Sequence, residues 1–272
     1  MESTISFEKS VFRKRLCSML KVDFRRMLRS KLFYILIACA FVMPVLMTVM
    51  MTMMDGTITV DPQTGAETVI HGPENVWQSI GTLPTFDGAA MGGMDVMAMC
   101  NINMMFMLVA VFVCIFVSDD FRSGYAKNLF TVRAKKGDYV FSKTLSGFIC
   151  GVLMLAAYLA GAMLGGGISG LSFELSGLTS LNVVFCIISK MMLMLVFVPI
   201  FVLISIGAKQ KAWLSICGSF GGGMLLFMMV PMITPLDSTA INAVLCLAGG
   251  ILFSVGLGAI GNRILNTTGL VQ

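Results

Sequence analysis

The sequence predicts an all-α, polytopic membrane protein with six transmembrane helices. Of its 272 residues, 57% are hydrophobic and 12% charged, and the mean hydropathy is +0.90, far from the values of soluble domains. A helix needs about 20 consecutive apolar residues to cross the hydrocarbon core. Runs of about this length occur at 32–54, 99–117, 144–168, 183–208, 213–234 and 241–261. Because the runs are continuous rather than alternating, they indicate helices and not an outer-membrane barrel.

The distribution of charge predicts which loops face the cytosol, since loops rich in Lys and Arg remain inside. Apart from Lys190, every basic residue lies before the first run, in the loop 118–143, between the fourth and fifth runs, or in the tail. The loops 55–98, 169–182 and 235–240 contain acidic residues but no Lys or Arg. We therefore expect both termini and the loop 118–143 in the cytosol, and the loop 55–98 outside. The net charge of +5 then reflects topology, and no nucleic-acid partner is expected.

The first element is an amphipathic arm, residues 1–31, ahead of a transmembrane domain at 32–272. Apolar residues recur in it at helical spacing among basic ones: Phe12, Leu16, Met19, Leu20, Phe24, Met27 and Leu28. The following apolar run exceeds the 7–15 residues of a signal-peptide core and ends without a small-residue cleavage site. The arm is therefore predicted to be a helix on the inner membrane surface, as a lipid anchor or as a partner contact.

The loop 118–143 contains a second amphipathic segment. Read as a helix, it places Phe121, Tyr125 and Leu129 on one face, with Asp119 and Asp120 at its positive N-terminal end. A helix of this kind between two spans either docks a partner protein or lies on lipid headgroups. The spacing alone does not choose between these alternatives.

Lys190 is the one basic residue inside an apolar run away from the inner side. A lysine at the bilayer centre costs about 2.5–3.5 kcal/mol on insertion scales, so an intramembrane charge indicates function by default. Two interpretations stay open: Lys190 anchors the span by snorkelling, or it faces a substrate path. In both, we expect its ammonium to reach water, outside or in a cavity.

The sequence predicts no catalytic, cofactor-binding or metal-binding residues. The motif GISG at Gly167–Gly170 is reminiscent of an intramembrane serine protease, but a serine nucleophile needs a base, and the single histidine, His71, lies in the loop 55–98. The cysteines show neither metal-ligand spacing nor an outer-loop pair. Since the chain also lacks a phosphate-binding G-x-x-x-x-G-K-[ST] loop, it is not expected to hydrolyse ATP by itself.

Two stretches resemble the permease subunits of ABC-2 type transporters: LKVDFRRMLRSKLFYILI at the first span, and DDFRSGYAKNLFTVRAKKGDYVFSK between the second and third. The resemblance follows the span order along nearly the whole chain and is nearest to small bacterial bacteriocin-immunity and bacitracin-resistance permeases. It implies that the arm is an elbow helix and that 119–130 is a coupling helix contacting the ATPase. Many relatives have Glu-Gly-Thr where this chain has Ser123-Gly124-Tyr125. The ATPase-coupling residues that the resemblance implies are Asp119, Asp120, Phe121, Arg122, Tyr125 and Leu129.

The resemblance further implies the permease of an ATP-driven exporter in the cytoplasmic (inner) membrane of a bacterium. Such a permease would export an amphipathic or hydrophobic substrate, such as an antimicrobial peptide, or extract it from the membrane. Its expected partners are membrane lipid, an identical or related second permease, and two ATPase subunits that hold ATP and Mg. The alternative is a channel-like or sensor membrane protein that acts without an ATPase. An intramembrane enzyme ranks third, because the spans lack paired catalytic groups.

Overall fold

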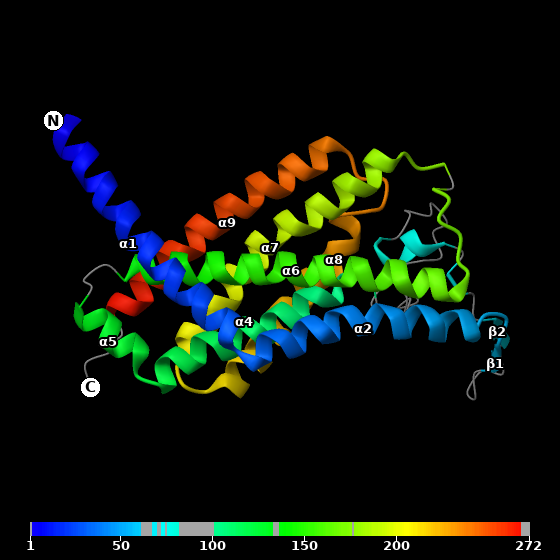
Figure 1. The fold of residues 1–272 in the computed structure, drawn as a ribbon, viewed down its shortest axis with the longest axis horizontal. Coiled ribbons are helices and arrows are strands. Elements are labelled where there is room, and N and C mark those ends of the chain that lie inside the picture. The colour runs from blue at the N-terminus through cyan, green and yellow to red at the C-terminus, as the bar shows by residue number, and fades with distance from the viewer. Residues whose placement is uncertain are drawn as a thin grey trace.

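The computed structural model describes residues 2–60, 67–69, 72–73, 75–81, 101–132, 136–175 and 177–267. His71 and most of the predicted external loop lie outside the described residues. The described chain is mainly helical (Figure 1): α1 (Glu2–Arg29), α2 (Lys31–Met53), α4 (Met104–Arg122), α5 (Tyr125–Val132), α6 (Gly137–Ser169), α7 (Ser180–Ala208), α8 (Ala212–Ile233) and α9 (Ala240–Thr267). Between α2 and α4 lie an antiparallel pair of short strands, β1 (Ile58–Val60) and β2 (Glu67–Val69), and a 3₁₀ helix, η1 (Val76–Ser79).

The described helices have the length and apolar composition of a multi-pass membrane protein. Five of them, α2, α4, α6, α7 and α9, are each long and apolar enough to cross a membrane. The remaining candidate, α8, bends by 46° between Ala212–Met224 and Leu226–Ile233, and it makes a sixth span if both parts belong to one crossing. The all-α membrane class is thereby confirmed. A helix also occupies the arm, as α1, while its position on the membrane surface and the orientation of the termini stay predictions.

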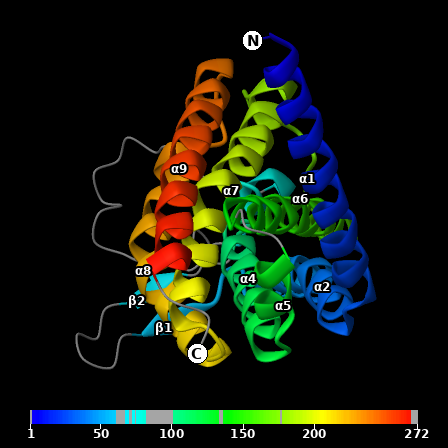
Figure 2. The ribbon, with the colours of Figure 1, turned by 90° about the vertical axis from the view of Figure 1, so that its left-hand side faces the viewer.

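The spanning helices alternate in direction, so their connections gather at two ends of the bundle (Figure 1). The end that we call the basic end holds α1, α5, the α7–α8 link and the end of α9. The opposite end, which we call the hairpin end, holds β1, β2, η1 and the α6–α7 and α8–α9 links. Seen from the basic end, α8 and α9 flank one side of the bundle and α1 and α2 the other (Figure 2).

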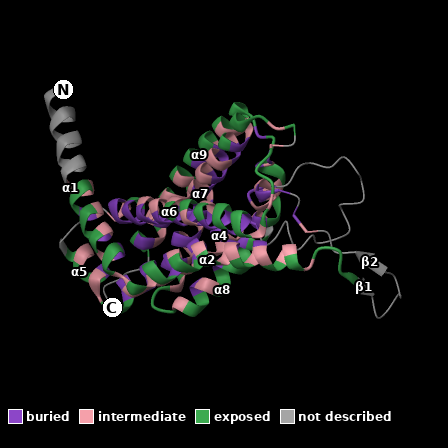
Figure 3. Cartoon of the chain, turned by 45° about the vertical axis from the view of Figure 1, so that its right-hand side comes forward, coloured by how far each residue is buried: buried purple, intermediate pink, exposed green. Residues whose placement is uncertain are grey.

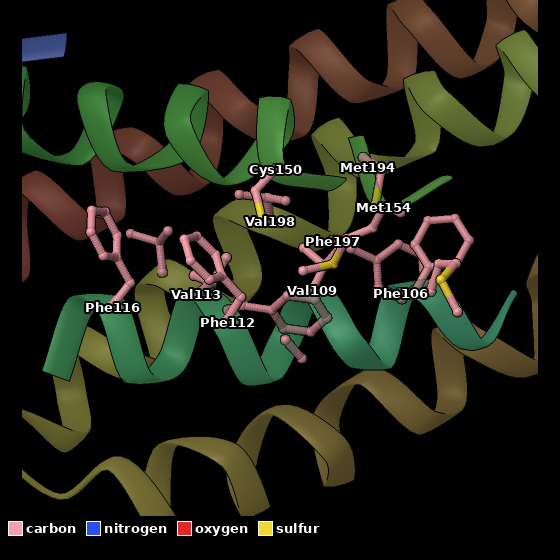
Figure 4. Packing of buried hydrophobic residues seen from close by; sticks show 14 of the residues in the cluster. Phe106, Val109, Phe112, Val113, Phe116, Cys150, Met154, Met194, Phe197 and Val198 are labelled. Carbon is pink, nitrogen blue, oxygen red and sulfur yellow. The ribbon is translucent and has the colours of Figure 1, made fainter. Parts of the chain in front are cut away.

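The core is centred on α4, whose side chains point toward α6 and α7 (Figure 4). The rings of Phe106 on α4 and Phe197 on α7 lie 4.6 Å apart between centroids. On another side, Cys114 and Ser219 of α8 form a hydrogen bond of 3.1 Å. Buried residues line the interior, whereas the outer faces of α2 and α9 are largely exposed (Figure 3). Exposed apolar faces suit contact with lipid, and close packing with hydrogen bonds holds the helices together where the hydrophobic effect is absent.

Helix α6 approaches α2 closely, because glycines remove the side chains that would intervene. A Cβ atom added at Gly161 would collide with the carbonyl oxygen of Phe41, and one at Gly165 would lie 3.0 Å from the Cα atom of Val45. Small residues four apart therefore form the α2–α6 contact.

The loop 118–143 differs from its prediction. Helix α4 continues through Asp119 and Asp120 to Arg122, and the chain then turns at Gly124, whose φ is +73°. The predicted single helix over 119–130 is therefore wrong: Asp119 and Asp120 lie in the last turn of α4, and a separate short helix, α5, follows. Helix α6 begins at Gly137, ahead of the apolar run at 144–168, and polar residues of its first turns are buried against α1 and α4.

Candidate functional site

The basic end contains a buried network of charged side chains from α1, α4 and α6. Helix α1 contributes Asp23, which is 2% exposed. Its Oδ1 atom lies 2.7 Å from Nζ of Lys143 on α6, and its Oδ2 atom accepts a hydrogen bond of 2.6 Å from the hydroxyl of Ser142. One carboxylate of α1 is thus held by two consecutive residues of α6.

Lys143 joins this carboxylate to a second one, from α4. Its Nζ atom also lies 2.7 Å from Oδ2 of Asp120, and both side chains are fully buried. The Oδ1 atom of Asp120 accepts a 2.5 Å hydrogen bond from Nη1 of Arg26 on α1. The Tyr139 hydroxyl donates to Oδ2 of Asp120 at 3.0 Å. Two acids and two bases therefore balance one another, and three helices share the network.

Aromatic rings surround the two cations. The ammonium of Lys143 lies 4.0 Å from the ring centroid of Phe116 and 5.4 Å from that of Tyr139. The guanidinium of Arg26 lies 4.4 Å from the ring centroid of Tyr125. Cations at these distances over aromatic faces gain further electrostatic stabilisation.

The protonation of Arg26 is set by two opposed effects. Burial alone would lower the pKa of the guanidinium, but the charge of Asp120 and the hydrogen bond to it raise the pKa above the ordinary value. Arg26 therefore stays charged at any physiological pH. A buried ion network is stabilising only while it is complete, because removing one member leaves another charge buried without its counter-ion.

The sequence of α1 places these groups on one helix face. Met19, Asp23 and Met27 follow one another at i, i+4 and i+8 and are all buried, and Arg26 lies three residues after Asp23. Nearer the start of α1, Nε of Arg15 lies 3.6 Å from a carboxylate oxygen of Asp138 on α6. The face that the sequence assigned to an amphipathic surface helix thus packs, in this part, on the bundle.

The predicted coupling residues fall into two groups. Asp120 and Phe121 are buried, with Phe121 edge-on to the ring of Tyr139 at 6.4 Å. Tyr125 and Leu129 are half-buried, Leu129 against the core. The apolar residues Phe121, Tyr125 and Leu129, which the resemblance assigns to ATPase coupling, therefore lie against Tyr139, Arg26 and the core of the bundle. Only Asp119 and Arg122 are open to solvent, as an ion pair of 3.3 Å with side chains 47% and 76% exposed.

The turn between α4 and α5 presents a polar surface outside these buried side chains. We call it the α4–α5 surface; it consists of the exposed residues Arg122, Ser123, Lys127, Asn128 and Thr131. Its two basic residues stand directly beside the residues that the network fixes. A coupling role for this loop stays a prediction.

Lys190 is enclosed by protein in the half of the bundle nearer the hairpin end. Its side chain is 0% exposed, and its Nζ atom donates to Oδ1 of Asn103 at 2.8 Å and to Oγ1 of Thr234 at 2.9 Å. The expectation that its ammonium reaches water is therefore wrong for this structure. Asn103 before α4 and Thr234 after α8 accept hydrogen bonds from the ammonium inside the bundle. The side chain of Lys190 therefore does not extend to the membrane surface.

Sequence reasoning did not single out the members of the network at Asp23, Arg26, Tyr139 and Lys143. The available signal was the presence of acidic residues within strongly basic flanks. Each of the four carboxylates at this end whose side chains the structure describes pairs with a base: Asp23, Asp119, Asp120 and Asp138.

Within the described residues, no group of three or more His, Cys, Asp or Glu side chains is placed to hold a metal ion.

The family profile described as ABC-2 family transporter protein matches residues 19–226, which include the network, the α4–α5 surface and Lys190. The chain belongs to this family. Its members are membrane components of ABC transporters, which work with ATPase subunits and are not themselves enzymes. No curated protein and no solved structure matches the chain.

Proposed function

We propose that the chain is the permease subunit of an ATP-driven exporter in the cytoplasmic membrane of a bacterium, with the basic end in the cytosol. Family membership supports the partnership with an ATPase. The charge distribution supports the orientation, since exposed basic residues gather at the end that holds α1, α5 and the α7–α8 link.

The α4–α5 surface is the proposed docking site for the ATPase, and one observation carries this proposal. Arg122 at the end of α4 and Lys127 in the first turn of α5 are exposed on either side of a short turn. Residues near them are fixed, Asp120 by its ion pairs and Tyr125 beneath Arg26. A displacement imposed on this turn is therefore passed to α1 through Arg26 and to α6 through Lys143. Force transmission requires this combination of an accessible surface and a rigid attachment.

The remaining parts of the proposal follow from the family resemblance. The functional assembly contains two ATPase subunits and a second permease, identical or related. ATP and Mg bind to the ATPase subunits. The substrate is amphipathic or hydrophobic, such as an antimicrobial peptide, and it leaves the cytoplasmic membrane or crosses it outward.

The docking site is tested by co-purification of the ATPase encoded with this chain. The double variant Arg122→Glu, Lys127→Glu should release most of the ATPase while the permease keeps its melting temperature, because both side chains are exposed. The matched control is Lys209→Glu, Lys211→Glu, which changes the charge equally at exposed positions of the same end. Retention of the ATPase by the first variant, or equal release by both, would contradict docking at the α4–α5 surface.

A further inference from the structure

Lys190 carries a buried positive charge that the described residues do not neutralise. Its ammonium contacts the amide oxygen of Asn103 and the hydroxyl of Thr234, both uncharged, and the described ion pairs do not include it. An ammonium has three donor hydrogens, of which these contacts use two. A buried charge without a counter-ion is a costly feature in a membrane span.

A second group beside Lys190 also lacks an acceptor. The amide oxygen of Asn103 accepts from Lys190, and the Nδ2 atom of the same amide is buried and has no hydrogen-bond partner. Asn103 is 1% exposed. Because the two atoms belong to one amide group, this unpaired donor lies close to the ammonium. The pair therefore offers an excess of donors and a net positive charge, which is the complement of a carboxylate.

The helix ends around Lys190 do not supply the missing negative charge. Asn103 caps the N-terminus of α4, where the helix dipole is positive, and Thr234 caps the C-terminus of α8, where it is negative. The two partial charges oppose each other, and the charge of the ammonium remains.

The site is bordered by an apolar cluster and by the end of a bent helix. The Sγ atom of Cys186 donates to the carbonyl oxygen of Thr234 at 3.5 Å, and Cys186 packs with Val183 and Leu236. Thr234 follows the bent part of α8, Leu226–Ile233, which contains Pro231. Interrupted helices commonly form substrate sites in transporters, because their ends bring free backbone groups and partial charges to the site.

We propose that Lys190, Asn103 and Thr234 form a binding site for the carboxylate of an amphipathic substrate. One carboxylate oxygen pairs with the ammonium of Lys190 and the other accepts from Nδ2 of Asn103. The apolar body of the substrate lies against the cluster of Val183, Cys186 and Leu236, and movement of the end of α8 admits it. This assignment rests on the proposed transport function, whose substrate class it narrows to amphiphiles with a free carboxylate.

Binding to the full chain in lipid nanodiscs, without nucleotide, tests the proposal. Two pairs of probes distinguish a peptide C-terminus from a fatty acid as the source of the carboxylate. The first pair is one amphipathic peptide with a free or an amidated C-terminus, and the second is one long-chain fatty acid with the corresponding alcohol. In at least one pair, the acid should bind about tenfold or more tightly than its uncharged counterpart. The pair that shows the difference identifies the source. Lys190→Met should abolish the difference, and Lys190→Arg, which keeps the charge, should retain part of it.

Three outcomes would overturn the site. The first is equal affinity within both pairs, and the second is an acid preference that survives Lys190→Met. The third is a melting temperature that falls in ligand-free Lys190→Met as far as in Lys143→Met, because Lys190 would then have a counter-ion within the chain itself. Since no ATPase is present, this test does not depend on docking at the α4–α5 surface. A failure of the carboxylate site can therefore be told apart from a failure of the docking proposal.

Discussion

Lys143 and Lys190 are both buried lysines of membrane helices, yet their surroundings differ in charge. Lys143 lies 2.7 Å from each of two carboxylates, Asp23 and Asp120. Lys190 donates hydrogen bonds to the neutral side chains of Asn103 and Thr234 and belongs to none of the described ion pairs. Burial by itself therefore does not reveal what a charged residue does. What distinguishes the two lysines is whether neighbouring side chains carry the opposite charge. Lys143 belongs to a complete ion network, whereas the site of Lys190 lacks an anion.

The two lysines also differ in the helices that they join. Lys143 links α1, α4 and α6 at the basic end, whereas Lys190 links α4, α7 and the end of α8 in the other half of the bundle. Helix α4 takes part in both, since Asn103 precedes its first residue and Asp120 lies in its last turn. A rigid α4 therefore connects the proposed docking end to the proposed substrate site.

The largest effect is expected from Lys143→Met, which leaves two carboxylates buried without their shared cation. Breaking a buried ion pair in this way costs about 3–5 kcal/mol. The purified variant should melt at a markedly lower temperature than the wild type, or fail to assemble. As a control, Asp23→Asn combined with Lys143→Met should recover part of the loss. An unchanged melting temperature in the single variant would show that the network does not hold α1 on the bundle.

A smaller effect is expected from Asp120→Asn. Lys143 keeps Asp23 as its counter-ion in this variant, and Arg26, whose side chain is 31% exposed, can turn to water. The loss should be about 1.5–3 kcal/mol, as for a hydrogen bond to a charged group. Denaturant unfolding of the two variants side by side measures the order. A greater loss for Asp120→Asn than for Lys143→Met would mean that Asp120, and not Lys143, is the central group of the network.

The smallest change is expected from Lys190→Met. Removing an unneutralised charge from a span is favourable, and the loss of two hydrogen bonds offsets part of the gain. The free energy of unfolding should therefore stay within about 1 kcal/mol of the wild type or rise slightly. A destabilisation as large as that of Lys143→Met would remove the distinction between the two lysines. Met is used in both variants so that side-chain size is matched.

The sequence by itself determined the class of the protein and the course of its chain. The apolar runs at 32–54 and 183–208 correspond to α2 (Lys31–Met53) and α7 (Ser180–Ala208), because hydrophobic length is a property of consecutive residues. The charge distribution similarly anticipated that α1, α5 and the α7–α8 link gather at one end. The turn at Gly124 was missed, since its positive φ interrupts a segment whose spacing suits one continuous helix.

The tertiary structure alone decided which faces meet. Helical spacing placed Phe121, Tyr125 and Leu129 on one face, but it could not show that Phe121 packs on Tyr139 and Leu129 on the core of the bundle. Nor could it bring Asp23 to Lys143, or enclose Lys190 between Asn103 and Thr234. The physical reason is that lipid and protein interior are both apolar, so a hydrophobic face in a membrane protein does not reveal what it packs against. Polar contacts between helices that are far apart in the sequence depend on which faces meet, so only the packed structure reveals them.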